Sequence, residues 1–335
     1  MSSKLNRRDF IAQSVSASAA GITVAATAGI AATAQAADPQ TNEKQAPAHQ
    51  AVTPSSKNTL PTGKIGKLTL SRLISGGNLI SGWAHSRDLQ YVPSLMRAYN
   101  TEDKVIDTLQ LLEEHGVNAI IADPAKKCMS VFGRYWKERG GKIQWIAEGH
   151  PDRGDWKTNI KQSIDFGASA IYIQGVICDN WYLEGCLDLA AKCMDFIKSQ
   201  GVPAGIGAHK LEVIMDSEAK NYGAEFYVKT LHHTMYWSAR RPDQKADVVQ
   251  NQADNYWDLD PEQTIAFMQT VKKPWIAFKC LAAGAIQPRS GYTYALRNGA
   301  DFICNGMFDY QVEDNVALIK ELLPKVQRRK RAWMA

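Results

Sequence analysis

The chain has 335 residues, of which 45% are hydrophobic and 22% are charged, and its formal net charge is +5 at pH 7. This composition excludes a disordered or fibrous protein and is typical of a globular one. Much of the positive charge lies in one terminal run, KVQRRKRAWMA (325–335), so the sequence does not predict a nucleic-acid-binding surface. We expect this basic tail to be a solvated helix end.

The first 36 residues have the features of an export signal. A twin-arginine pattern, NRRDFIA (6–12), precedes an Ala-rich apolar stretch, and AQA (34–36) fits the small-residue rule for signal cleavage. The apolar stretch is too short and too weakly apolar to span a membrane stably. We therefore predict a Tat signal over 1–36, recognition by the Tat export machinery, a periplasmic or otherwise exported protein, and no transmembrane span in the mature chain.

Residues 37–62 are polar and rich in proline, and they predict a disordered linker before a folded region over 63–324. The folded region begins with a hairpin and a first strand over 64–77. Short apolar runs then alternate with amphipathic segments. The further strands are expected at 117–123, 142–150, 168–175, 202–209, 225–233, 273–283 and 300–307. The helices are expected at 101–116, 130–141, 155–167, 186–201, 212–223, 260–271, 291–299 and 312–326.

Each of the eight expected strands is followed by a helix, and the helices repeatedly end at a glycine. Continuous apolar strands that alternate with helices indicate a parallel sheet that is covered on both faces. Eight such units predict a single closed (β/α)8 TIM barrel. An open doubly wound sheet is the alternative, and the absence of a Gly-rich dinucleotide fingerprint after the first strand disfavours it.

The barrel prediction locates the active site, because catalytic residues of this fold lie at the C-terminal ends of the strands. Nearly every expected strand ends in a group that can move protons or bind a ligand. The expected catalytic residues are Asp123, Glu148, His209, Lys229 and Lys279. The strand ends expected to bind substrate are Asn78, Gln174 and Asn305. Lys229 interrupts the apolar run of FYVKTLHHTMYW (226–237), and the alternative is that it points outward between helices.

Two kinds of chemistry fit these strand ends. Glu148 together with histidines can bind a divalent metal through mixed nitrogen and oxygen ligands. The candidate metal ligands are His150, His209, His232 and His233. Since the last two are neighbours on a strand, at most one of them is expected to reach the centre of the site. Alternatively, Lys229 or Lys279 in an apolar pocket acquires a lowered pKa and can form a Schiff base.

The loops after the first, fourth and sixth strands, SGWAHSRDLQYV, CDNWYLEG and TMYWSARR, are rich in aromatic residues. Aromatic side chains at a barrel opening can stack on the apolar face of a sugar, and an arginine can hold its polar groups. The side chains expected to do so are Trp83, Arg87, Trp181, Tyr182, Trp237 and Trp257. The alternative is that these residues pack a loop over the site.

Several segments resemble the aldo-keto reductases. SQGVPAGIGAHKLEVI (199–214) is similar to that family's GKIRxIGVSN strand and the LE that follows it. FKCLAAGA (278–285) resembles the MKPLAGG stretch of the ferredoxin-linked bacterial branch, and GADFICNGMFDYQVEDNVAL (299–318) resembles the family's last strand with its LEENV helix. KIGKLTLSRLISGGN (64–78) is similar to its opening hairpin. The resemblance covers most of residues 64–320 and implies a barrel of this family.

The resemblance also implies NADPH-dependent carbonyl reduction by an Asp, Tyr, Lys and His tetrad, and three of these four positions differ here. Asp123 matches the aspartate, whereas the tyrosine is missing and Tyr135 follows too late. Glu148 stands in place of the lysine, and Gln174 stands in place of the histidine. Hydride transfer needs an acid to protonate the developing alkoxide. Because three of its four positions differ, the reductase tetrad is largely replaced, and we do not expect ordinary reductase activity.

Together these features predict an exported barrel enzyme that performs acid–base or metal-assisted lyase, isomerase or hydrolase chemistry on a small polar, carbohydrate-like substrate. Glu148 is the expected general base, and His209 is an expected acid or metal ligand. An oxidoreductase with tightly held NADP and a non-catalytic sugar-binding barrel are the alternatives. The sequence identifies no cofactor, although it favours a divalent metal over NADP, and it specifies neither the substrate nor the oligomeric state.

Overall fold

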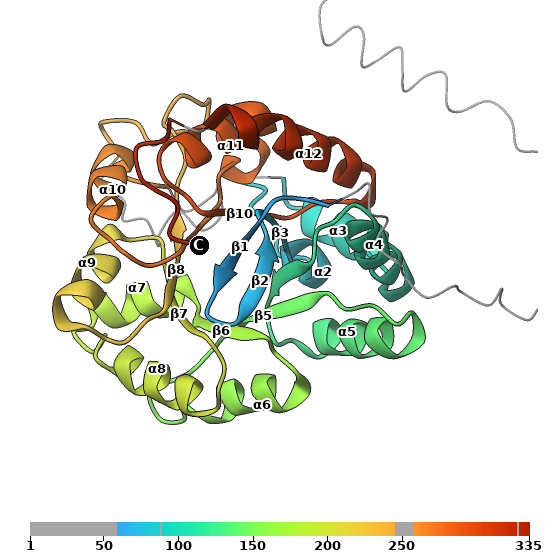
Figure 1. The fold of residues 1–335 in the computed structure, drawn as a ribbon, viewed down its shortest axis with the longest axis horizontal. Helices are drawn as coiled ribbons and strands as arrows, with labels where there is room; N and C mark the ends of the chain where they lie inside the picture. Colours follow the sequence, from blue (N-terminus) through green and yellow to red (C-terminus); the bar gives the residue numbers. More distant parts are fainter. Residues whose placement is uncertain (1–58, 88, 245–256, 327) are drawn as a thin grey trace, which may run out of the picture. The chain divides into compact units, whose positions relative to one another are not determined.

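The computed structural model of the chain describes residues 59–87, 89–244, 257–326 and 328–335 (Figure 1). The expected export signal (1–36) and nearly all of the expected linker (37–62) therefore lie outside the described residues. The fold described here belongs to one compact unit, His49–Ala335. Across the described ranges, no helix combines the length and the apolar character that a membrane crossing requires.

Eight parallel strands close into a barrel in the order β10-β3-β4-β5-β6-β7-β8-β9. They are β3 (Leu73–Gly76), β4 (Ala119–Ala122), β5 (Gln144–Gly149), β6 (Ala170–Ile173), β7 (Ala204–Ala208), β8 (Phe226–Thr230), β9 (Trp275–Phe278) and β10 (Phe302–Asn305). The last strand closes the ring against the first, with Cys304 opposite Ile74. The predicted (β/α)8 barrel is confirmed.

Helices surround the barrel (Figure 1). They are α2 (Asn78–Ser81), α3 (Val92–Tyr99), α4 (Glu102–Glu114), α5 (Lys126–Glu138), α6 (Thr158–Phe166), α7 (Gly175–Leu183), α8 (Leu189–Ser199), α9 (Leu211–Lys220), α10 (Pro261–Met268), α11 (Pro288–Arg297) and α12 (Asp309–Leu322). Short 3-10 helices are η2 (Ala282–Gly284) and η3 (Leu323–Val326). Three helices, α2, α3 and α7, lie in segments that were not expected to be helical. The helix α2 has only four residues, and α7 is apolar on most sides, whereas α3 is amphipathic and was missed.

Alternate residues of each strand point into the barrel, where they form one buried apolar cluster. Its strand members are Ile74, Ala119, Ile121, Ile146, Ala170, Tyr172, Phe226, Val228, Ile276 and Phe302. An antiparallel hairpin of β1 (Thr62–Ile65) and β2 (Leu68–Ser71) adds Ile65 and Leu70 to the same cluster. Figure 1 shows this hairpin in front of the centre of the barrel. Because the hairpin plugs the N-terminal end, a substrate must approach from the opposite end.

Two glycines of β7 make room for aromatic rings inside the barrel. A Cβ atom at Gly205 would lie 2.5 Å from the Phe226 ring, and one at Gly207 would lie 2.8 Å from the Tyr172 ring. Both distances are shorter than a carbon–carbon contact allows, so glycine is required at these positions. The Tyr172 ring therefore lies directly beneath the C-terminal end of the barrel, and Glu148 is its register partner on β5.

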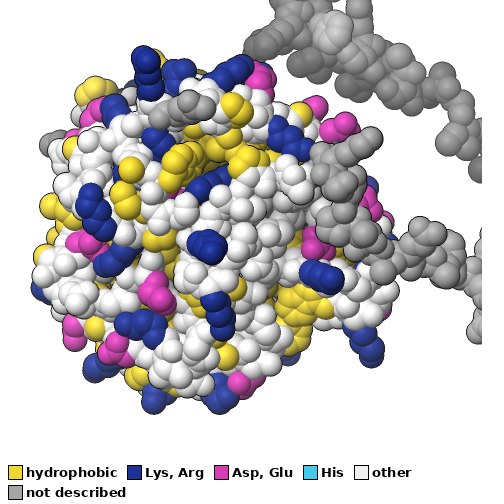
Figure 2. All heavy atoms as spheres, in the orientation of Figure 1, with side chains coloured by type: hydrophobic (Ala, Val, Ile, Leu, Met, Phe, Trp, Pro, Cys, Tyr) yellow, Lys and Arg dark blue, Asp and Glu magenta, His cyan; other side chains and the backbone are white. Residues whose placement is uncertain are grey.

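The basic tail differs from the solvated helix end that the sequence analysis expected, and that expectation was wrong. After η3 the chain returns to the barrel, where the buried Arg331 forms an ion pair with Asp301 at 2.6 Å. The same guanidinium donates hydrogen bonds to backbone oxygens of Val271 and Gly299 at 3.0 Å each. Figure 2 shows this N-terminal face, where hydrophobic side chains gather in a hollow near the place at which Figure 1 marks the C-terminus.

Replacement of Arg331 by alanine should destabilise the barrel. The change removes the closer of the two guanidinium groups that, among the described residues, pair with the buried Asp301 carboxylate, and it leaves only Arg329, at 3.7 Å. Loss of one partner of a buried ion pair typically costs about 3–5 kcal/mol of unfolding free energy, and we expect the lower end of that range here. Urea denaturation followed by far-UV circular dichroism measures the effect. Arg328 is exposed, and Arg328→Ala is the matched control that should change stability by no more than ~0.5 kcal/mol. Equal stability of the two variants would contradict the buried ion pair.

Candidate functional site

The C-terminal ends of the barrel strands and the loops that follow them form what we call the mouth. Residues two positions beyond an inward-pointing strand residue also point inward. By this rule Asp123 follows Ile121, Glu148 follows Ile146, and Gln174 follows Tyr172, each of which belongs to the interior cluster. The structure thus brings these three predicted residues together at the mouth.

Lys279 follows the last residue of β9 and has a left-handed backbone, with φ of 57°. Its side chain is half-buried, and its Nζ lies 2.8 Å from Nε2 of His85 in the loop after α2. Burial lowers the pKa of Lys279 to about 7, although the nearby Glu148 and Cys304 favour its protonated form. The mouth therefore holds an amine that is partly neutral near pH 7.

Glu148 is the carboxylate beside this amine. The Gln174 side chain donates a hydrogen bond to Glu148 Oε2 at 3.2 Å, and His150 Nε2 lies 3.7 Å from the same oxygen. Burial and the charge of Glu148 raise the pKa values of the Tyr172 hydroxyl and the Cys304 thiol. Both groups consequently stay protonated and uncharged at neutral pH.

His209 lies at the end of β7 and is held by a carboxylate that the sequence analysis missed. Its Nδ1 lies 2.7 Å from Oδ2 of Asp179 on α7, and both side chains are buried. Asp179 also accepts the backbone N–H groups of His209 and Lys210, at 3.1 and 3.0 Å. Burial lowers the pKa of His209, whereas the Asp179 charge opposes that effect. In this pair the Asp179 carboxylate orients the His209 imidazole, which can exchange a proton.

Asp123 has a positioning role in this structure. It accepts hydrogen bonds from Ser81 Oγ at 2.8 Å, from Cys128 Sγ at 3.0 Å and from the indole Nε1 of Trp83 at 3.0 Å. The Trp83 side chain is nevertheless 62% exposed. Asp123 therefore fixes the orientation of an exposed ring at the edge of the mouth.

Arg87 reaches across the mouth to the segment after β8. Its guanidinium donates to Ser238 Oγ at 2.9 Å and to the Ala282 backbone oxygen at 3.3 Å. It also stacks on the Trp237 ring at 4.5 Å, and Trp237 is 75% exposed. Trp83, Arg87 and Trp237 thus lie where the sequence analysis expected substrate-binding groups.

Lys229 does not point into the mouth, and its predicted catalytic role does not match its position. Phe226 and Val228 face the interior, so Lys229 faces the helix layer. There it is fully buried and lies 3.5 Å from Oδ1 of Asp258, which also accepts a hydrogen bond from Thr264 at 3.1 Å. The outward alternative of the sequence analysis is the one that the structure shows.

The two histidines after β8 are bound into loops. His232 Nε2 accepts the backbone N–H of Asp258 at 3.1 Å, so its Nδ1 carries the proton that bonds the Lys279 backbone oxygen at 3.2 Å. Burial and the charge of Lys229 lower the pKa of His232 to about 3. His233 Nε2 lies 2.9 Å from Ser290 Oγ. Among the described residues, no three His, Cys, Asp or Glu side chains come together as a metal site.

Other predicted substrate-binding residues lie away from the mouth. Asn305 points outward from β10 and donates to the Tyr292 hydroxyl at 2.7 Å. Trp181 is buried in the helix layer on α7, and Tyr182 packs against the same core. Asn78, in contrast, begins α2 just beyond β3, at the edge of the mouth, and its backbone oxygen accepts the N–H of Trp83 at 2.9 Å. The sequence analysis misplaced Trp181 and Tyr182 because it took their helix for a loop.

Trp257 is buried and donates to the Ser238 backbone oxygen at 3.2 Å. It therefore packs beneath the loop that carries Trp237, as the loop-packing alternative of the sequence analysis expected.

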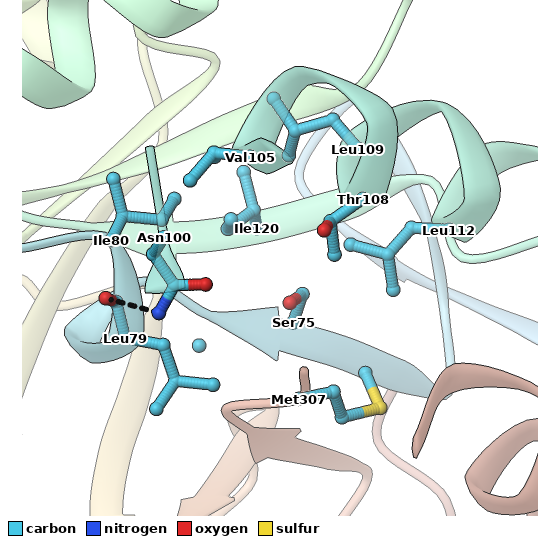
Figure 3. Close-up of a pocket in the computed structure, with 11 residues that line it drawn as sticks. Ser75, Leu79, Ile80, Asn100, Val105, Thr108, Leu109, Leu112, Ile120 and Met307 are labelled. Carbon is cyan, nitrogen blue, oxygen red and sulfur yellow. Dashed lines mark hydrogen bonds between the residues drawn. The ribbon is translucent and has the colours of Figure 1, made fainter. Parts of the chain in front are cut away.

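A small cavity of about 20 Å³ lies outside the barrel, between β3, β4 and α4 (Figure 3). Apolar side chains such as Ile120 and Leu109 line it, together with Ser75 and Asn100, whose amide donates to the Leu79 backbone oxygen at 3.0 Å. This volume suits one water molecule and no substrate. This small cavity therefore does not replace the mouth as the candidate site.

Comparisons with known proteins agree with the barrel and show no family. No protein-family model and no curated protein matches the chain. An aldo-keto reductase structure from Pseudomonas aeruginosa is similar over 80% of this chain and 98% of its own, with a TM-score of 0.53 and 14% identity. An N-acetylneuraminic acid synthetase from Leptospira borgpetersenii serovar Hardjo-bovis covers 81% of this chain and 91% of its own, with a TM-score of 0.49 and 10% identity. At such identities the likeness concerns the fold alone.

Lys229→Met should destabilise the protein by about 3–5 kcal/mol, because it leaves Asp258 buried without its charge partner. Adding Asp258→Asn removes the unpaired charge and should restore most of that loss. Urea unfolding of both variants checks this, with Lys272→Met at an exposed position as the control. A Lys229→Met protein as stable as the unmodified one would show that the ion pair has no structural role.

Proposed function

We propose that this protein is an enzyme that acts on a small polar carbonyl compound, with Lys279 as its amine nucleophile, in lyase or isomerase chemistry. One observation carries the proposal. Lys279 Nζ lies half-buried at the mouth, 2.8 Å from His85 Nε2, and its pKa is lowered to about 7. A lysine amine must be neutral to attack a carbonyl, and burial is the usual means of making it so at neutral pH.

The chemistry begins with attack of the Lys279 nitrogen on the carbonyl carbon. The new C–N bond forms as the carbonyl oxygen takes up a proton, and loss of water then leaves an imine. An imine withdraws electrons from the neighbouring carbon, so a base can remove a proton there. Glu148, which has a Gln174 hydrogen bond at 3.2 Å, is the proposed base. His209, oriented by Asp179 at 2.7 Å, is the proposed acid.

The proposed substrate is carbohydrate-like. Trp83 and Trp237 expose their rings at the mouth, and each is held by a polar contact, from Asp123 and from Arg87 respectively. Rings that are fixed in place lose little conformational entropy when a sugar stacks on them. The amide of Gln174 and the guanidinium of Arg87 supply polar groups for hydroxyls.

The proposed place of action is outside the cytoplasm. The support for it is the twin-arginine pattern NRRDFIA (6–12) with the cleavage motif AQA (34–36). An enzyme that relies on its own lysine needs no freely diffusing nicotinamide cofactor there, so the proposed chemistry and the proposed location are compatible.

Borohydride should trap a carbonyl adduct on Lys279. The protein is incubated with dihydroxyacetone, reduced, digested and mapped by mass spectrometry. Because the neutral amine reacts, the yield should rise with pH and reach half its maximum near pH 7, the pKa of Lys279. An ordinary lysine, with a pKa near 10.5, should react appreciably only at much higher pH.

Lys279→Met should abolish this adduct, whereas the exposed-site variant Lys272→Met should keep it. Trapping that is spread over surface lysines, with none at Lys279, would rule out the amine mechanism. A nicotinamide nucleotide retained by the purified protein would instead favour the oxidoreductase alternative. Sugar binding without any trapped adduct or turnover would favour the non-catalytic barrel.

Glu148→Gln should shift the trapping midpoint to lower pH. The Glu148 charge stabilises protonated Lys279, so its removal lowers the pKa of the amine further. Turnover of the true substrate should fall at the same time, because the proposed base is lost. Glu212→Gln, at an exposed position on α9, is the matched control that should leave the midpoint unchanged. A midpoint that moves upward would contradict the proposed interaction.

A further inference from the structure

We propose that His85 is the residue that moves protons at Lys279 Nζ, and that the loop of residues 82–87, the strap, holds it there. This inference rests on the proposed amine chemistry and adds a catalytic residue to it. The sequence analysis did not single out His85. Its partner in the chain is 194 positions away, so only the folded barrel brings the two side chains together.

Three alternate residues of the strap are anchored to three different parts of the mouth. Trp83 Nε1 donates to Asp123, just beyond β4, at 3.0 Å. His85 Nε2 lies 2.8 Å from Lys279 Nζ, just beyond β9. Arg87 donates to Ser238, in the segment after β8, at 2.9 Å. The strap therefore crosses the mouth with His85 between two fixed points, which limit how far the backbone of His85 can move from the amine.

The backbone at both ends of the strap and at Lys279 is in a conformation that L-residues rarely adopt. Gly82 has φ of 74° and Arg87 has φ of 58° at the two ends of the strap, and Lys279 has φ of 57°. For a residue other than glycine such a backbone costs on the order of 1 kcal/mol or more and persists only where the surroundings impose it. The strained positions are thus Arg87, at one end of the strap, and Lys279, whose amine the strap approaches.

Imine formation needs two proton transfers at this point, and His85 is placed for both. After Nζ attacks the carbonyl carbon, the nitrogen must lose a proton, which His85 Nε2 accepts. The imidazolium then returns that proton to the hydroxyl of the carbinolamine. The C–O bond breaks, water leaves, and the nitrogen lone pair forms the C=N bond. The first proton on the oxygen comes from solvent water, and the nitrogen keeps one of its two original protons in a protonated imine. The step thus takes up one proton from solvent and requires no other reactant.

The other ionisable groups around Lys279 have different positions in the mouth. Glu148 on β5 and Cys304 on β10 favour the protonated amine, and His209 on β7 is bound by Asp179. Lys229 is turned to the helix layer. His85 reaches Nζ from the loop side, so it can accept a proton without occupying the barrel opening from which a substrate carbonyl approaches.

The test is the rate of imine formation with dihydroxyacetone, followed by borohydride quenching at successive times and by mass spectrometry of the Lys279 peptide. His85→Gln should slow adduct formation by about 100-fold, which is the lower end of the rate effect expected when a general acid–base group is lost. His85→Ala should regain rate when imidazole is added to the solution. Trp83→Phe keeps the ring but loses the Asp123 bond, and it should slow the reaction about 10-fold through misplacement of the strap.

His115→Gln, on the far side of the fold at the end of α4, is the control and should react like the unmodified protein. Imidazole rescue is measured within a single His85→Ala preparation, so it separates lost chemistry from lost folding. If unmodified protein forms no Lys279 adduct, the amine function itself fails. If it forms the adduct and His85→Gln forms it equally fast, or imidazole does not rescue His85→Ala, the role of His85 is overturned.

Discussion

The closed barrel imposes one constraint on the whole site: successive residues of a strand point to opposite sides. Because Ile146 lies in the packed interior, Glu148 must point into the mouth. Because Val228 lies there too, Lys229 must point into the helix layer, where it meets Asp258 at 3.5 Å. Two strand ends with ionisable side chains thus have opposite roles, one in the site and one in the scaffold.

The scaffold side of β8 is nevertheless connected to the mouth. The charge of Lys229 contributes to the low pKa of His232, about 3, so that the imidazole stays neutral. Neutral His232 accepts the N–H of Asp258 and donates from Nδ1 to the backbone oxygen of Lys279. A buried cation and a buried imidazole therefore hold the residue that carries the proposed nucleophile in its left-handed conformation.

The fold was predictable from the sequence because the eight strands and most of the helices between them leave a local apolar pattern, and many of these helices end close to a glycine. The inward side of a strand was harder to predict, since runs such as AIIA and FYVKT are buried on both sides, and the pattern does not distinguish them. Asp179, His85 and the Asp301 partner of Arg331 were missed because their contacts join segments 30, 194 and 30 positions apart. Such pairings depend on the closed ring rather than on any local signal.

The central claim is that the barrel mouth holds a lysine amine whose pKa is low enough for a substantial neutral fraction near physiological pH. The most direct measurement is an NMR titration of the full protein with ¹³C at the lysine Cε positions, in which Lys279 is assigned through its loss in Lys279→Met. The account predicts a midpoint close to 7 for Lys279. A midpoint near the ordinary lysine value of 10.5 would contradict it, because the amine would then be protonated and unable to attack a carbonyl at neutral pH.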